Sequence, residues 1–374
     1  MTSQKDGLAC SSRDDFVSLK GFDHVELYVG DARQAAHFYR TTFGFLPVAY
    51  AGLETGERDR VSFVMEQGQI RLILTSSISP ESPVAEHVLL HGDSVKDIAF
   101  EVDDAAHAFE VAVKRGAAPV AAPSVFENQD GHMIKSTIAA CGHTVHSFIQ
   151  RDGPQSAFLP RYRPIPKSPP ALSTGLEAID HIAISVEKGA LDRWIDFYKN
   201  VLDFHQSHQE DIFTEYSAMN SKVVQNDNGG VKFPIMEPAL GRGKSQIEEY
   251  LEFNRGPGAQ HVAFLSNDIV ETVRLLRENN IEFLSSPDTY YQMLGDRIGE
   301  IDESVDPLRE LNILVDRDQW GYLLQIFSKP LQSRPTLFVE IIQRVGARGF
   351  GSGNIRALFE AVEREQAMRG NLSS

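Results

Sequence analysis

Two hydrophobic periodicities alternate along the chain. Stretches in which every second residue is apolar predict β-strands, as in 61–76, where Gln67-Gly68 marks the turn of a hairpin. Stretches with apolar residues three and four positions apart predict helices, each opened by Asp or Asn: 31–45, 103–117 and 267–281. The C-terminal segment 351–370 also has one apolar face. We expect this last helix to cover an opening in the fold.

The order of these elements is repeated within the chain. GFDHVELYV (21–29) matches AIDHIAISV (178–186), and VKDIAFEVDD (95–104) matches AQHVAFLSND (259–268). Each half contains a strand, a helix and then several strands. The pattern predicts an α+β fold of two tandem modules, each built from paired βαβββ units that form a curved mixed sheet, with a C-terminal lid helix.

Proline content divides the chain. Residues 153–171 carry six prolines, which is typical of a stiff, extended connection. We therefore predict an N-terminal module over 1–155 that begins with a loose tail, a linker over 156–174, and a C-terminal module over 175–374.

Composition narrows the class of protein. The 374 residues are 42% hydrophobic and 24% charged, as in soluble globular proteins. A formal charge of −16 argues against nucleic acid or an anionic membrane as a partner. Only two cysteines are present, and no apolar run approaches the ~20 residues that cross a bilayer. We expect a cytoplasmic protein.

Three residues on predicted strands are candidate metal ligands. His181 lies in IDHIAISV, His261 in AQHVAFLS and Glu340 in PTLFVEIIQR. A strand histidine is often only a hydrogen-bonded structural residue, but a carboxylate in an apolar strand needs a cation. Two imidazoles and one carboxylate form the facial triad of Fe(II) oxygenases rather than a closed zinc site. From spacing alone, the structural and metal interpretations both stay open.

The first half of the chain lacks this set. His24 matches His181, but Asp97 stands where the second half has His261. The first half also reaches the linker without an evident counterpart of Glu340. We therefore predict that only the second module binds a metal.

Several polar and aromatic residues could surround that metal. Ser221, Gln246, Gln260 and Gln325 are expected on strands or strand edges of the second module, where buried amides need partners. They could equally hydrogen-bond the backbone. Three phenylalanines could form plain core or line an aromatic pocket: Phe327, Phe338 and Phe350.

Four segments carry a resemblance to a known family: KSQIEEYLEF (244–253), AQHVAF (259–264), GYLLQIFSKP (321–330) and RPTLFVEIIQR (334–344). Through them the chain resembles 4-hydroxyphenylpyruvate dioxygenase and 4-hydroxymandelate synthase, of the vicinal oxygen chelate superfamily. The resemblance extends over nearly the whole chain. It implies one Fe(II) per chain on His181, His261 and Glu340, with 4-hydroxyphenylpyruvate and dioxygen as substrates. It also leads us to expect a homo-oligomer, a dimer or a tetramer.

The resemblance also implies roles for the surrounding residues. Three glutamines would act in catalysis: Gln246, Gln260 and Gln325. Eight residues would bind substrate: Ser221, Pro234, Met236, Phe327, Phe338, Phe350, Asn354 and Ile355.

Two positions depart from the dioxygenase pattern and bear on the product. The dioxygenases usually read PINEP where this chain has Met236, and GNF where it has Ile355. The synthases are aliphatic at both positions. If the aromatic ring of the substrate is held less firmly, its benzylic carbon can turn towards the oxidising group at the metal. These positions therefore favour 4-hydroxymandelate as the product, with homogentisate as the alternative. A protein that binds metal and ligand without turnover, and a preference for phenylpyruvate, also stay open.

Overall fold

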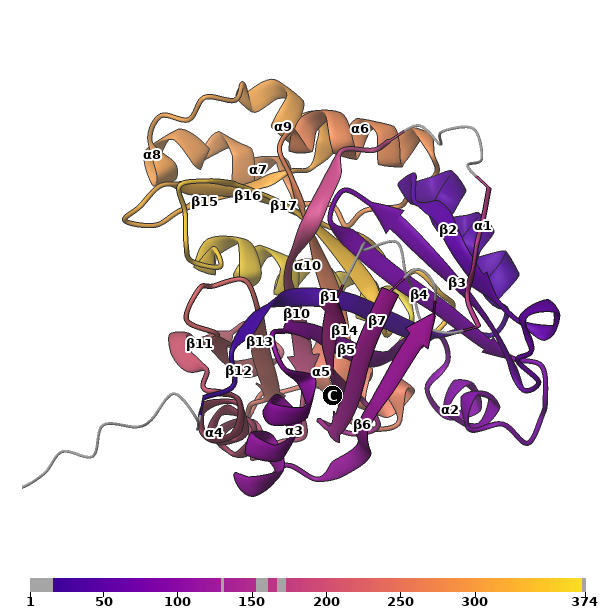
Figure 1. The fold of residues 1–374 in the computed structure, drawn as a ribbon. Coiled ribbons are helices and arrows are strands. Elements are labelled where there is room, and N and C mark those ends of the chain that lie inside the picture. Colours follow the sequence, from indigo (N-terminus) through magenta and orange to yellow (C-terminus); the bar gives the residue numbers. More distant parts are fainter. Residues whose placement is uncertain (1–15, 129–130, 153–160, 167–172, 372–374) are drawn as a thin grey trace, which may run out of the picture.

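Two mixed β-sheets lie side by side in the molecule (Figure 1). The computed structural model describes residues 16–128, 131–152, 161–166 and 173–371. The first sheet has nine strands in the order β6-β7-β8-β5-β1-β4-β3-β2-β9. Its strands are β1 (Leu19–Tyr28), β2 (Leu46–Ala51), β3 (Arg60–Gln67), β4 (Ile70–Ser77), β5 (Ser94–Val102), β6 (Pro119–Asn128), β7 (Gly131–Ala139), β8 (Val145–Asp152) and β9 (Arg163–Pro164).

The second sheet has eight strands in the order β11-β12-β13-β10-β14-β17-β16-β15. Its strands are β10 (Leu176–Ser185), β11 (His205–Phe213), β12 (Ala218–Gln225), β13 (Lys232–Pro238), β14 (Gly258–Ser266), β15 (Leu314–Arg317), β16 (Tyr322–Phe327) and β17 (Phe338–Val345).

Apart from the short strand β9 at the edge of the first sheet, the two sheets have the same topology, which confirms the repeat predicted from the sequence. Strands β1, β5 and β8 of the first sheet correspond to β10, β14 and β17 of the second. In each triplet the first pair is antiparallel and the second is parallel. The predicted boundaries at 155 and 174 stay a prediction, because most of the linker lies outside the described residues.

The helices begin where the sequence predicts capping residues. Asp31, Asp104 and Asp268 each accept a hydrogen bond from a backbone N–H in the first turn of the helix that follows. The helices are α1 (Ala32–Phe43), α2 (Pro83–His91), α3 (Ala105–Lys114), α4 (Leu191–Leu202), α5 (Gln246–Asn254), α6 (Ile269–Glu278), α7 (Asp288–Gln292), α8 (Leu294–Ile298), α9 (Val305–Leu311) and α10 (Ser352–Met368). Helix α10 is the predicted C-terminal helix, and Ile355 ends its first turn.

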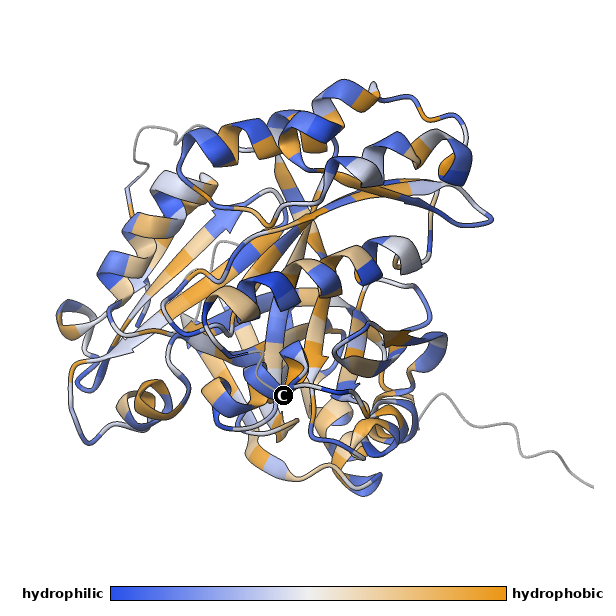
Figure 2. Cartoon of the chain, turned by 180° about the vertical axis from the view of Figure 1, so that it is seen from behind, coloured by the Kyte–Doolittle hydropathy of each residue, from blue (hydrophilic) through white to orange (hydrophobic). Residues whose placement is uncertain are grey.

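One hydrophobic core extends through both modules. The strands are mostly apolar, whereas the surface helices carry polar residues on their outer sides (Figure 2). At the junction, Phe233 of β13 packs against Phe22, Phe100 and His146 of the first module, with ring centroids 5.7–6.1 Å apart. The modules therefore form a single folded unit.

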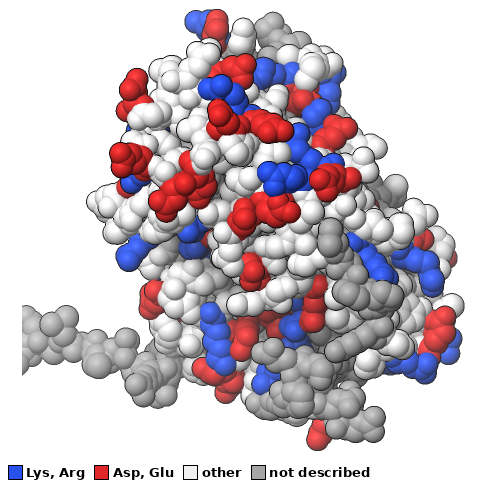
Figure 3. All heavy atoms as spheres, turned by 90° about the horizontal axis from the view of Figure 1, so that it is seen from above, with Lys and Arg blue, Asp and Glu red and all other residues white. Residues whose placement is uncertain are grey.

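Acidic and basic side chains are interspersed on the face shown in Figure 3. Within the described part of the chain, no helix has the length and apolar character needed to cross a membrane.

A histidine at the junction should make the protein sensitive to acid. The buried ring of His146 lies with Nδ1 3.1 Å from the carbonyl oxygen of Ile98 and Nε2 2.9 Å from the hydroxyl of Tyr198. Burial lowers the pKa of His146 to about 4 from an ordinary 6.5. Because the unfolded chain then binds more protons below pH 6.5, stability is lost as the pH falls from 6.5 towards 4.

We predict that His146 alone removes about 2 kcal/mol of stability between pH 7 and pH 5. His146→Gln is less stable than the wild type at pH 7, but the gap should narrow by that amount at pH 5. Urea unfolding at the two pH values measures it. Parallel pH profiles for the two proteins would contradict the assignment.

Candidate metal centre

Three buried side chains converge from adjacent strands of the second sheet. His181 on β10 is paired in register with Ala263 on β14, and Ala263 is paired with Glu340 on β17. His261 lies two residues before Ala263, so all three functional side chains project from one face of the sheet. His181 Nε2 lies 3.2 Å and His261 Nε2 lies 3.5 Å from Glu340 Oε2.

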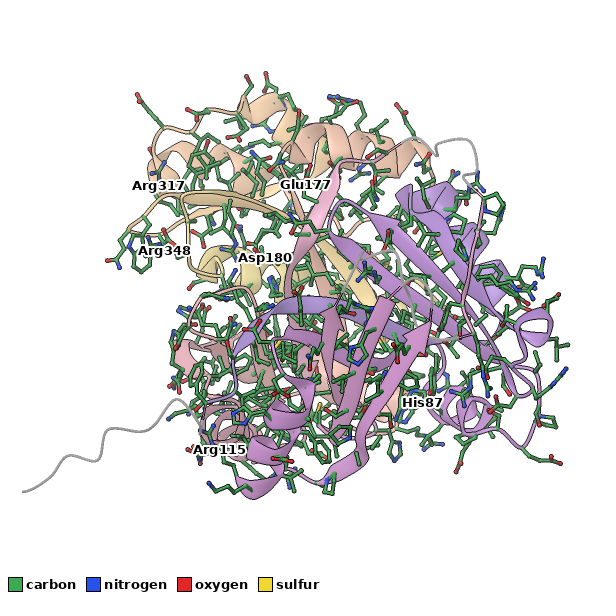
Figure 4. The ribbon with its side chains drawn as sticks, viewed as in Figure 1. His87, Arg115, Glu177, Asp180, Arg317 and Arg348 are labelled. Atoms are coloured by element: carbon green, nitrogen blue, oxygen red, sulfur yellow. The ribbon has the colours of Figure 1, made fainter. Side chains whose placement is uncertain are left out.

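Neighbouring groups fix the orientation of each ligand. The carboxylate of Asp180, labelled in Figure 4, lies 2.8 Å from His181 Nδ1 and is bound by Arg344 through two N–H groups, at 2.7 and 2.8 Å. Gln325 Nε2 donates to Glu340 Oε1 over 2.8 Å. Such partners set which imidazole nitrogen and which carboxylate oxygen face a metal.

Electrostatics keep the carboxylate ionised. Burial alone would raise the pKa of Glu340, but the imidazoles of His181 and His261 outweigh that effect and lower it to about 2. Burial alone would lower the pKa of His181, but Glu340 and Asp180 outweigh it and raise the pKa. Burial dominates at His261, whose pKa is lowered.

This arrangement fits a divalent metal ion. Among the described residues, His181, His261 and Glu340 are the one group of three candidate ligands whose donor atoms all lie within 4.8 Å of one another. Both Nε2 atoms face the same carboxylate oxygen, while both Nδ1 atoms contact side-chain oxygens, of Asp180 and Gln260. A set of two histidines and one carboxylate leaves coordination positions for substrate and suits Fe(II).

The triad opens into a cavity between the curved sheet and α10. Its wall is apolar over most of its extent, with polar groups near the triad. The lining residues are His181, His208, Glu210, Met219, Ser221, Val223, Pro234, Met236, Gln246, Gln260, His261, Gln325, Phe327, Glu340, Phe350, Ile355 and Leu358.

Comparison with protein families agrees with this architecture. The model for the glyoxalase/bleomycin resistance protein/dioxygenase superfamily matches residues 21–136 and 178–326, one range in each module. The 4-hydroxyphenylpyruvate dioxygenase of Yarrowia lipolytica is 43% identical over 95% of this chain and 94% of its own length. That of Danio rerio is 43% identical over the whole chain and 96% of its own.

A solved structure is also similar to this chain. A mutant of 4-hydroxymandelate synthase from Streptomyces coelicolor superposes with a TM-score of 0.84 and 38% identity, over 93% of this chain and 99% of that one. The chain belongs to the family of 4-hydroxyphenylpyruvate dioxygenase and 4-hydroxymandelate synthase. This chain is therefore an enzyme of that family.

Nine of the predicted pocket residues line the cavity. The sequence placed Gln246 on a strand, but it is the first residue of α5, where Ser245 caps the helix. The other eight lie where the strands and helix of the second module enclose the cavity: Ser221, Pro234, Met236, Gln260, Gln325, Phe327, Phe350 and Ile355.

Two predicted residues do not contact the cavity. Phe338 stacks on the far side of the His261 ring, with centroids 4.7 Å apart. Asn354 is fully buried, with its amide 2.9 Å from Gln325 Oε1 and 2.8 Å from the Tyr290 hydroxyl. Neither residue lines the cavity, and their role in substrate binding stays a prediction. They support His261 and Gln325, which do line the cavity.

Sequence reasoning missed five lining residues. Met219, Val223 and Leu358 are apolar positions that look like ordinary core. His208 and Glu210 are polar residues of β11, a strand whose pattern HQSHQEDIF indicates exposure. A register prediction pairing β11 with β12 would have placed Glu210 opposite Ser221, which was already suspected.

The first module contains a modified copy of the centre, in which a serine stands at the position of the carboxylate ligand Glu340. Ala99 pairs with both His24 and Ser147, so Ser147 occupies the position of Glu340. Asp97 occupies that of His261. Lys135 occupies the position of Gln325 and places Nζ 3.0 Å from Asp97 Oδ2.

Mutation of the ligands should abolish metal binding. We predict that Glu340→Gln weakens Fe(II) affinity by well over 100-fold, because it removes the anionic ligand, whereas Asp180→Asn weakens it by about 10- to 100-fold by releasing His181. Anaerobic titration calorimetry measures both. His24→Asn, the matching change in the first module, is the control and should leave one iron per chain. Wild-type affinity in Glu340→Gln would exclude this centre.

The ammonium group of Lys135 should be needed for folding rather than for metal binding. Lys135→Met leaves the carboxylate of Asp97 buried without its cation, and we predict a loss of about 3 kcal/mol in unfolding free energy. Adding Asp97→Asn should recover most of that loss, since no buried charge then remains. Chemical denaturation measures the unfolding free energy of each variant. If Lys135→Met alone were as stable as the wild type, the stabilising role of Lys135 would be refuted.

Proposed function

We propose that the protein uses Fe(II) and dioxygen to decarboxylate 4-hydroxyphenylpyruvate oxidatively. The observation that carries this proposal is a buried His–His–Glu triad facing a half-apolar cavity, in a chain 43% identical to named 4-hydroxyphenylpyruvate dioxygenases. His181, His261 and Glu340 would hold the iron, which supplies a chelating site for the keto acid and activates dioxygen.

The polar end of the cavity would position the keto acid. Gln246 and Gln260 line the cavity together with the triad and present amides to it. Gln260 Oε1 is occupied by His261 Nδ1 at 3.2 Å, so its NH₂ group is suited to donate to a substrate oxygen. Gln325 acts differently, because its amide holds Glu340 in place. Its substitution should impair the metal site before it impairs substrate binding.

The apolar end would hold the ring and exclude water. Phe350, Ile355, Leu358 and Met236 line this part of the cavity. The edge of the Phe350 ring also contacts the His181 imidazole, with centroids 5.2 Å apart and planes at 76°. An aryl group enclosed there is fixed relative to the metal, which favours reaction at one carbon.

The favoured product is homogentisate. Relatives at 41–43% identity that span nearly the whole chain are named 4-hydroxyphenylpyruvate dioxygenase, against 38% for the synthase. This reverses the preference for 4-hydroxymandelate drawn from the sequence. In the reaction to either product, 4-hydroxyphenylpyruvate loses one carbon dioxide and the two oxygen atoms of dioxygen are added. They are isomers, so the outcome depends on where one hydroxyl enters.

The second candidate product is 4-hydroxymandelate. It is supported by the side chains of Ile355 and Met236, both of which line the cavity and neither of which offers a π face or an amide to the ring. The structural similarity to the Streptomyces coelicolor synthase supports it as well.

One incubation tests the proposal. Purified protein, ferrous iron, ascorbate and 4-hydroxyphenylpyruvate are held in air, oxygen uptake is followed, and the products are separated by chromatography. One carbon dioxide per oxygen consumed is expected, with homogentisate. Tight binding of iron and keto acid without oxygen uptake would indicate a binding protein instead. Placement in the cytoplasm and a dimer or tetramer are further expectations, the latter testable by light scattering.

We predict that Ile355→Phe raises the share of homogentisate at the expense of any 4-hydroxymandelate. A Phe there can stack on the substrate ring, and a bias of about 1.4 kcal/mol between two barriers changes the ratio tenfold. Met236→Asn should act in the same direction. Ile355→Leu, which adds no ring, serves as the control. An unchanged ratio in the double variant would refute control by ring orientation, and a wild type that forms homogentisate alone would remove the second candidate.

A further inference from the structure

Strand β11 turns alternate side chains towards the cavity although its sequence is polar. His208, Glu210 and Ile212 are wholly or partly buried, whereas Gln209 and Asp211 between them are exposed. His208 and Glu210 both line the cavity that contains the metal ligands. Because side chains alternate along a strand, β11 directs the imidazole of His208 and the carboxylate of Glu210 into the cavity. The other lining residues near them are largely apolar.

Both groups present a buried polar atom that lacks a partner. His208 Nε2 and Glu210 Oε2 are shielded from solvent and have no hydrogen-bond partner among the described residues. They lie 3.6 Å from each other, beyond hydrogen-bond distance, and their side chains are 34% and 16% exposed. Leaving such atoms unsatisfied is costly, and a ligand that supplies both a donor and an acceptor would satisfy them together.

The pair lies next to the part of the cavity proposed to hold the aryl ring. Glu210 is paired in register with Ser221, which is paired with Met236, so the three side chains form one row across the sheet. His208 is paired with Val223, which is paired with Pro234. Both rows line the cavity wall.

The pair is also within reach of a ligand bound at the metal. The Phe350 ring has its centroid 5.2 Å from that of His181 and 6.5 Å from that of His208. One aromatic ring thus separates the metal ligand from the polar pair.

We propose that Glu210 and His208 bind the 4-hydroxyl group of the substrate ring and make the enzyme selective for 4-hydroxyphenylpyruvate over phenylpyruvate. This assignment rests on the proposed function. Glu210 accepts a hydrogen bond from the phenol, and the His208 imidazole donates to the phenol oxygen. No proton is transferred, so both residues position the ring and take no part in bond breaking.

Selectivity follows from the unsatisfied atoms. A phenol hydrogen bond to a carboxylate is charge-assisted and stronger than one between neutral groups. Phenylpyruvate would fill the same space and leave both polar atoms without a hydrogen bond, with only each other at 3.6 Å. Sites that hydrogen-bond a substrate hydroxyl reject the analogue that lacks it far more strongly than apolar pockets reject a change of size.

The test compares two ligand pairs in wild type, Glu210→Leu and His208→Phe. The first pair is 4-hydroxyphenylpyruvate and phenylpyruvate, compared as kcat/KM in air. The second is 4-hydroxyphenylacetate and phenylacetate, compared as binding constants by calorimetry in metal-free protein. We expect Glu210→Leu to reduce the preference for the hydroxylated member at least tenfold in both assays, with phenylacetate binding unchanged or improved. Asp211→Asn, an outward-facing neighbour on β11, is the matched control and should keep the wild-type preference.

The outcomes separate this assignment from the proposed function. Absence of oxygen uptake with either keto acid would refute the proposed function. The phenol site would still be supported if the wild type binds 4-hydroxyphenylacetate more tightly than phenylacetate and Glu210→Leu loses that preference. Turnover with an unchanged preference in both variants would overturn the assignment. An equal loss for both members of a pair would overturn it too, because that indicates a structural role. Glu210→Gln keeps an acceptor and should retain an intermediate preference, which guards against misfolding in the Leu variant.

Discussion

The burial of Glu340 is the constraint on which the rest of the second module depends. An ionised carboxylate at the centre of an apolar sheet is tolerable only with positive or hydrogen-bonding partners on every side. His181 and His261 supply one side and Gln325 supplies another. Their partners in turn need support, which Asp180, with Arg344, provides for His181. The centre is therefore a connected network built outward from one charge.

The first module satisfies the same constraint without an external ion. Its buried carboxylate, Asp97, is neutralised by the ammonium group of Lys135 and accepts a hydrogen bond from Ser147. The outer frame is retained, since Asp23 lies against His24 and is bound by Arg151 much as Asp180 is bound by Arg344. In the first module the cation beside the buried carboxylate is thus a lysine side chain, whereas the second module has a site suited to a metal ion.

Local pattern was enough to predict the repeated order of elements, the helices that begin after Asp31, Asp104 and Asp268, and three candidate ligands, because periodicity, capping residues and a charge in an apolar strand are local signals. It was wrong for Gln246, which was expected on a strand but begins α5. Contacts between distant strands were not accessible in this way. The inward face of β11 is an example, since Glu210 is polar in sequence and only its pairing with Ser221 turns it into the cavity. Asn354 shows the converse: it lies at the start of the lid helix but turns away from the cavity to support Gln325.

The retained frame around His24 has a consequence for how such proteins can diversify. A sheet that already holds an oriented imidazole and its carboxylate–guanidinium support differs from a metal-binding sheet mainly at Asp97, Lys135 and Ser147. A structural module and a metal-binding module then differ by a few side chains on the same backbone fold. Duplication followed by loss or gain at those positions would let one half of the molecule specialise while the other preserves the fold for both.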